Sequence, residues 1–115
     1  MTYKDRFISF IHKADKLFST DMEMSENKKY LLGTLSELLD QVVKTSYCDN
    51  VEFYASESGN LTVEFMGEDI EIQNGRSNPF FSVAGLADAV NIRSEDDKSF
   101  ILFVFHNIWE LKSVE

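Results

Sequence analysis

The spacing of apolar residues changes near residue 46, and this change constrains the fold more than any other feature of the chain. Before it, apolar residues recur every three to four positions, which is typical of amphipathic helices. After it, they alternate with polar residues, which is typical of half-buried strands. The sequence therefore predicts an α+β fold, with an N-terminal antiparallel helix pair packed on one face of an antiparallel sheet of about four strands and a short helix before the last strand. We expect residues 1–115 to form a single globular domain.

Two helices are predicted in the first part of the chain. The first spans residues 3–18, and the second starts at Ser25, whose side chain is a favourable N-cap. The apolar stripe of the first helix consists of Phe7, Phe10, Ile11, Ala14, Leu17 and Phe18. The stripe of the second consists of Leu31, Leu32, Leu35, Leu38, Leu39 and Val42. Because a short loop joins the two helices, they are predicted to pack antiparallel.

Three alternating segments follow, at residues 51–55, 61–65 and 70–72. Between the first two, Glu57-Ser58-Gly59 fits a three-residue hairpin turn with Gly59 in the left-handed conformation. Between the second and third, Gly67-Glu68 fits a two-residue turn. These turns place all apolar side chains of the three segments on one face, which a correct strand register requires.

The same registers place carboxylates on the other face. Glu52 falls opposite Glu64, and Glu64 falls opposite Glu71. Like charges that are directly opposed on a sheet are destabilising, so the change Glu64→Gln is expected to raise stability. The row is compatible with a plain solvated face or with an acidic docking surface, and the sequence leaves both interpretations open.

The C-terminal part predicts a short helix, a buried strand and a short tail. Asn78 and Pro79 fit the N-cap and first residue of the helix, with Val90 on its inner side. Residues 100–105 are apolar at every position, which predicts a strand buried on both faces. Residues 107–115 are expected to form a short helix, although a strand remains open.

The negative charge is distributed unevenly. Residues 1–46 hold 7 basic and 7 acidic side chains, and the rest of the chain holds 4 and 13, so the net charge of −9 lies entirely after residue 46. Such an asymmetry indicates a basic partner and excludes direct binding to nucleic acid or to an anionic membrane. The candidate partner-binding residues are Glu52, Glu64 and Glu71 at the centre, with Asp69, Glu95, Asp96 and Asp97 at the rim.

No catalytic, cofactor-binding or metal-binding residues are predicted. His12, His106 and Cys48 supply only three of the four ligands that a zinc site of His and Cys needs. The acidic run Glu95-Asp96-Asp97 lacks the alternate spacing and glycine of a calcium loop. The single cysteine allows no internal disulfide, and no apolar run reaches the roughly 20 residues of a membrane helix, so we expect a cytoplasmic protein.

These features favour a small acidic, non-enzymatic protein-binding module. It would be an inhibitor of the immunity or phage anti-defence type, which neutralises a basic nuclease or nucleic-acid-binding effector. The alternative is a secretion-chaperone-like or oligomeric adaptor that uses apolar surface near residues 100–105 and Trp109. An enzyme that uses paired carboxylates comes third, because a flat exposed sheet offers no cleft that excludes water. The oligomeric state is left open.

Overall fold

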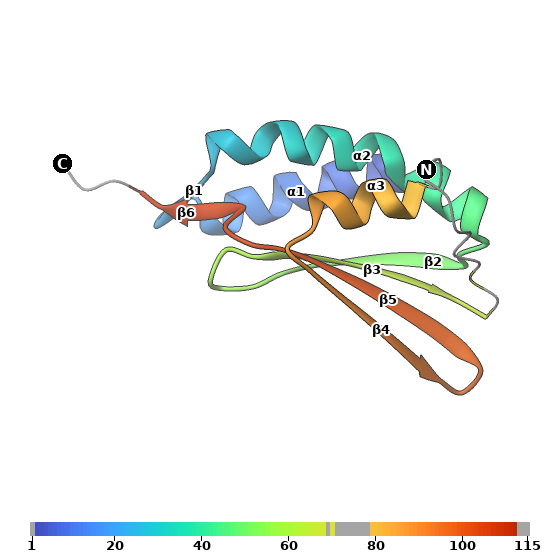
Figure 1. The fold of residues 1–115 in the computed structure, drawn as a ribbon. Coiled ribbons are helices and arrows are strands. Elements are labelled where there is room, and N and C mark those ends of the chain that lie inside the picture. Colours follow the sequence, from blue (N-terminus) through green and yellow to red (C-terminus); the bar gives the residue numbers. More distant parts are fainter. Residues whose placement is uncertain (1, 69, 71–78, 113–115) are drawn as a thin grey trace.

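The computed structural model describes residues 2–68, 70 and 79–112. In chain order these residues form α1 (Tyr3–Phe18), β1 (Met22–Met24), α2 (Glu26–Ser46), β2 (Asn50–Ala55), β3 (Leu61–Gly67), α3 (Pro79–Leu86), β4 (Ala89–Glu95), β5 (Lys98–Phe105) and β6 (Trp109–Leu111). Strands β2, β3, β5 and β4 form one antiparallel sheet in that order. All three helices lie on the same face of this sheet (Figure 1). The predicted α+β class is therefore confirmed.

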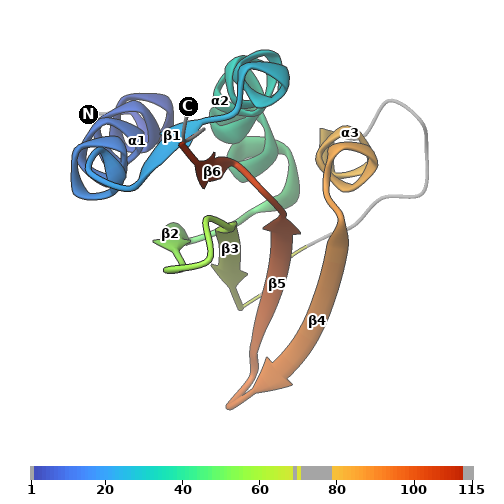
Figure 2. The same ribbon diagram turned by 90° about the vertical axis from the view of Figure 1, so that its left-hand side faces the viewer.

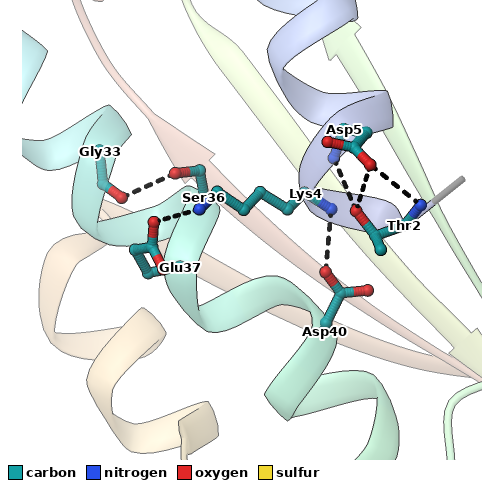
Figure 3. Close-up of polar contacts among 7 residues, drawn as sticks. All are labelled: Thr2, Lys4, Asp5, Gly33, Ser36, Glu37 and Asp40. Carbon is teal, nitrogen blue, oxygen red and sulfur yellow. Dashed lines mark hydrogen bonds and ion pairs between the residues drawn. The ribbon is translucent and has the colours of Figure 1, made fainter.

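The two long helices are joined at one end by polar contacts (Figure 3). Thr2 and Asp5 form a capping box at the start of α1. The Asp40 carboxylate of α2 accepts hydrogen bonds from the backbone N–H groups of Tyr3 and Lys4, at 3.0 and 3.1 Å. Lys4 also pairs with Glu37 on α2. Because the start of α1 contacts the second half of α2, the helices run antiparallel, as predicted.

The hairpin between β2 and β3 has the predicted register. Phe53 lies opposite Val63, and Glu52 lies opposite Glu64. Gly59 adopts the predicted left-handed conformation, with φ of 89°. Its carbonyl accepts hydrogen bonds from the backbone N–H groups of Ile108 and Trp109, at 2.9 and 3.1 Å. This turn therefore also holds the C-terminal segment against the sheet.

The core lies between the helices and the inner face of the sheet. Phe65 packs edge-on against Phe80 of α3 and Phe103 of β5, with ring centroids 5.2 and 5.6 Å away. Phe53 packs against Phe7 of α1 at 5.1 Å. Trp109 is buried, and its Nε1 donates a hydrogen bond of 3.3 Å to Asp15 on α1. Trp109 therefore belongs to the core.

Three local expectations were wrong. The helix after Pro79 ends at Leu86, and Val90 belongs to a strand, β4. Residues 109–111 form strand β6 instead of a helix. The partner of β6 is β1, in a connector where the sequence indicated no strand, and the pair forms a second, two-stranded sheet. In β6, hydrogen bonding to the distant β1 replaces the expected helix, whereas β4 pairs with β5, the next strand in the sequence.

Candidate protein interface

The predicted carboxylate row is present only in part. Glu52 and Glu64 are directly opposed on the outer face, the face of the sheet away from the helices. The other neighbour of β3 is β5, so Leu102 fills the position opposite Glu64 that was predicted for Glu71. Ile70 lies outside any strand, and Asp69 and Glu71 themselves lie outside the described residues. The three-strand row is therefore replaced by one opposed pair beside an apolar residue.

An arginine that the sequence analysis did not consider lies beside this pair. Arg93 of β4 reaches across β5, and its Nη2 lies 3.6 Å from Glu64 Oε2. Its Nη1 lies 2.7 Å from Glu95 Oε2, and its guanidinium lies 4.1 Å from the centre of the Phe100 ring. The Glu64 side chain is only 12% exposed. Glu64 is thus a partly buried, paired carboxylate, and the expectation that it points freely to solvent was wrong.

Glu52 has weaker partners at the β2 edge. Its Oε1 accepts a hydrogen bond of 2.7 Å from Asn50 and lies 4.0 Å from the Arg6 guanidinium. Tyr54, on the same face of β2, has a pKa raised above its usual value by burial and by the nearby charges of Glu64 and Glu52. Glu52 is therefore the more exposed and less closely paired member of the opposed pair.

The outer face also carries an apolar stripe that the sequence predicted to be buried. Phe100, Leu102 and Val104 of β5 alternate with the buried Ile101, Phe103 and Phe105. These three outer residues are half-buried, and none of the described elements covers the outer face (Figures 1 and 2). The prediction that this strand is buried on both faces was therefore wrong. Contiguous apolar surface with a polar rim is a feature of interaction sites.

The hairpin formed by β4 and β5 extends away from the helices (Figure 1). All seven residues of β4 are exposed, including Val90 and Ile92, whose side chains are 46% and 60% accessible. At the far end, Asp96 and Asp97 form the turn, with φ of 50° and 64°. The rim residues Glu95, Asp96 and Asp97 are all exposed at this tip. The structure therefore brings these three acids together, about one strand length from Asp88 at the start of β4.

Several acids of the N-terminal half are neutralised within the fold. Glu37 pairs with Lys4, and Glu26 pairs with Lys29. Asp40 accepts hydrogen bonds from backbone N–H groups in the first turn of α1. At the end of the molecule opposite the β4–β5 turn (Figure 1), Glu23 and Glu110 are directly opposed across β1 and β6. Sequence reasoning missed this second opposed pair because neither strand was predicted.

The remaining chemical candidates occupy unremarkable positions. His12 and Asp15 lie with Lys29 around a groove of about 440 Å³ between α1 and α2, whose floor is formed mainly by apolar side chains. Burial raises the pKa of the Cys48 thiol to about 12, so this cysteine is protonated at neutral pH. Among the described residues, no group of three or more His, Cys, Asp or Glu side chains is arranged to hold a metal ion. No helix within the described ranges has the length and apolar character that crossing a membrane requires.

Comparison with known proteins gives no match: no family model, no curated protein and no solved structure is significantly similar to this chain.

Proposed function

We propose that this chain is a small, non-enzymatic protein-binding module that binds a basic partner on the β4–β5 side of its sheet. The partner class is a nuclease or another nucleic-acid-binding effector, which the module inhibits as immunity or anti-defence proteins do. Such partners carry positive clefts for phosphates, and a negative protein surface competes for them. The lone, protonated Cys48 is compatible with the reducing cytoplasm that the proposal assumes.

The half-exposed stripe of Phe100, Leu102 and Val104 is the observation that carries the proposal. A stable interface needs an apolar centre surrounded by polar residues, because charge alone gives encounter rate more than affinity. Here the stripe supplies the centre, and Glu52 and the acidic tip at residues 95–97 lie around it. The proposed docking surface thus has an apolar centre, whereas the surface predicted from the sequence had three carboxylates at its centre.

The adaptor alternative depends on two apolar surfaces, at residues 100–105 and at Trp109, and the second of these is buried. Trp109 is only 1% exposed, and its indole N–H is bonded to Asp15, so it cannot contact a partner without unfolding. The apolar stripe remains common to both hypotheses. Charge dependence separates them, because in an adaptor the acidity would contribute only to solubility.

The test is a pull-down from the native host, followed by kinetics with the purified captured protein at low and high salt. We expect a basic partner whose association rate falls steeply with salt. The variant Glu95→Gln, Asp96→Asn, Asp97→Asn should slow association by at least about tenfold at low salt. Asparagine retains the left-handed backbone at the turn, so this variant keeps the hairpin.

A matched control removes the same number of charges from the opposite end. In Asp21→Asn, Glu23→Gln, Glu110→Gln, all three residues are exposed and lie far from the β4–β5 turn (Figure 1). This control should change the association rate by less than about twofold. Equal effects of both variants, or an association rate insensitive to salt, would refute acidic docking at this site. Glu64 is left unchanged so that Arg93, which loses its 2.7 Å pair with Glu95 in the first variant, keeps one carboxylate partner.

A further inference from the structure

Strand β4 forms one outer edge of the sheet, and the described residues leave that edge unpaired. It is hydrogen-bonded to β5 on one side only, and the order β2-β3-β5-β4 ends with it. A strand in this position presents backbone N–H and C=O groups that can pair with another strand. The seven residues of β4 exceed the length of a typical short edge strand.

Two of the devices that commonly block such an edge, a β-bulge and a proline, are missing from β4. Its residues pair with β5 one to one from Ala89 to Glu95, so no bulge interrupts it, and it contains no proline. Its two most apolar side chains, Val90 and Ile92, lie on the helix side of the sheet yet remain 46% and 60% accessible. An edge that is long, regular and partly apolar is a template for strand addition.

Arg93 is the one cation on β4, and it does not guard the edge. Its guanidinium lies over the Phe100 ring and pairs with Glu64 of β3 and Glu95 of β4, so the side chain folds back over β5, away from the unpaired side. The positive charge of this strand therefore lies over β5 and not at the unpaired edge. The two ends of the strand are acidic, with the exposed Asp88 before it and the exposed Asp96 and Asp97 after it. Asp88 also accepts a hydrogen bond of 2.7 Å from the backbone N–H of His106, and Glu95 is paired with Arg93.

From this geometry we infer that β4 binds its partner by accepting an extended strand that is apolar in the middle and rich in lysine or arginine at both ends. This inference rests on the proposed function, since it specifies how the basic partner is held. The backbone of the added strand would extend the sheet beyond β4. Its alternate apolar side chains would cover Val90 and Ile92, and its basic ends would face the acids at the ends of β4.

A second copy of this chain fits the same edge less well. In any antiparallel two-fold pairing of β4 with itself, the acidic tip of one copy approaches the start of β4 in the other, where Asp88 lies. Both copies also carry a net charge of −9. Like-charge juxtaposition opposes such a pairing, whereas a basic strand gains from the same acids.

The probe is a nine-residue synthetic peptide in which Val and Ile alternate with Thr, with two Lys residues at each end. Binding to the full chain is measured by fluorescence polarisation. Two further peptides are N-methylated, one at the Val and Ile amides and the other at the Thr amides. An added strand uses only one alternate set of its amides, so one methylated peptide should bind at least about tenfold more weakly and the other nearly as well as the parent.

Two protein variants provide a matched comparison. Ile92→Lys and Tyr54→Lys add the same charge at exposed positions on the two outer strands of the sheet. Ile92→Lys should weaken peptide binding by at least about tenfold, and Tyr54→Lys by less than about twofold. Peptide-induced protection of β4 amides in hydrogen exchange of the unmodified protein gives a readout that does not depend on either variant folding.

Other results would overturn the inference in distinguishable ways. If both methylated peptides bind equally and the acid-to-amide variant at residues 95–97 still weakens binding, acidic docking survives and strand addition is wrong. If no peptide binds, or β4 gains no protection, strand addition is also wrong, while the kinetics with the captured protein test the proposed function separately. If the unmodified chain is a dimer that Ile92→Lys dissociates, a second copy occupies the edge instead.

Discussion

The two outer strands of the sheet, β2 and β4, differ in how far the rest of the molecule covers them. Along β2, the Tyr3 hydroxyl of α1 donates to the Asp49 carbonyl at 3.1 Å, and Phe53 packs under Phe7 and Phe10 of α1. Along β4, every residue is exposed. Helix α1 lies over β2, whereas the β4–β5 hairpin projects below the helical layer (Figure 2). Strand pairing alone therefore does not bury a strand, because β4 is fully paired with β5 and still exposed at every residue.

The largest expected effect concerns the turn of the β2–β3 hairpin. A Cβ atom at Gly59 would lie 2.1 Å from the Trp109 carbonyl oxygen, and the residue has φ of 89°. Gly59→Ala combines left-handed strain with overpacking and should cost about 3 kcal/mol or more of unfolding free energy. Urea denaturation measures it. A loss below about 1 kcal/mol would mean that this turn is no more tightly packed than the exposed turn at Asp96 and Asp97.

The second prediction compares the same substitution in the two outer strands. Val51 in β2 is fully buried, whereas Val90 in β4 is 46% exposed. Val51→Ala should lower the unfolding free energy by about 2–3 kcal/mol, and Val90→Ala by less than about 1 kcal/mol. Urea denaturation gives the difference in unfolding free energy from the midpoints, provided that the variants have equal m-values. Similar losses at both sites would remove the contrast between the strands.

The third prediction concerns Arg93, which connects β4 to Glu64 on the outer face. Arg93→Gln leaves Glu64 opposite Glu52 without its nearest cation, and it should cost about 1 kcal/mol because the pair is only partly shielded from water. Glu64→Gln loses the same ion pair but also removes the repulsion from Glu52. The two effects offset each other, so the unfolding free energy should change by less than about 0.5 kcal/mol. Chemical denaturation at low salt, with the double variant, measures the coupling. A clear gain for Glu64→Gln would restore the original expectation of a repulsive row.

The smallest expected effect is at the exposed turn. Asp97 has φ of 64° as the second residue of a two-residue turn, where glycine is preferred. Asp97→Gly should raise the unfolding free energy by about 0.5 kcal/mol, because it relieves left-handed strain in a residue without buried contacts. Thermal denaturation at fixed salt tests the sign. A loss of stability would show that this carboxylate makes contacts that hold the hairpin.

The half of the fold encoded by local signals could be predicted from the sequence. Helical spacing defined α1 and α2, and the turn at Gly59 together with strict alternation gave the β2–β3 register residue by residue. Strand β4 was missed because Val83, Ala87 and Val90 also fit a helical spacing. The signal that could have located it is the pair Asp96-Asp97, which suits a two-residue hairpin turn before residues 98–105.

The candidate site could be predicted only in part, for a topological reason. The Glu64–Glu71 pairing assumed that consecutive segments are neighbours in the sheet, which holds for only about two thirds of strands. Instead the chain forms α3 and β4 before β5 returns beside β3, and Leu102 takes the place opposite Glu64. The pairing of Glu64 with Arg93, 29 positions away, depends on this return and leaves no local pattern.

Residue-by-residue hydrogen exchange of the chain alone tests the contrast between the two outer strands most directly. The amides of β4 that bond to β5 should exchange at least about a hundredfold faster than those of β2 that bond to β3, because the exposed hairpin opens locally while β2 opens only with the core. Exchange in β4 as slow as in β2 would contradict the account, since it would mean that β4 is held as firmly as the strand covered by α1.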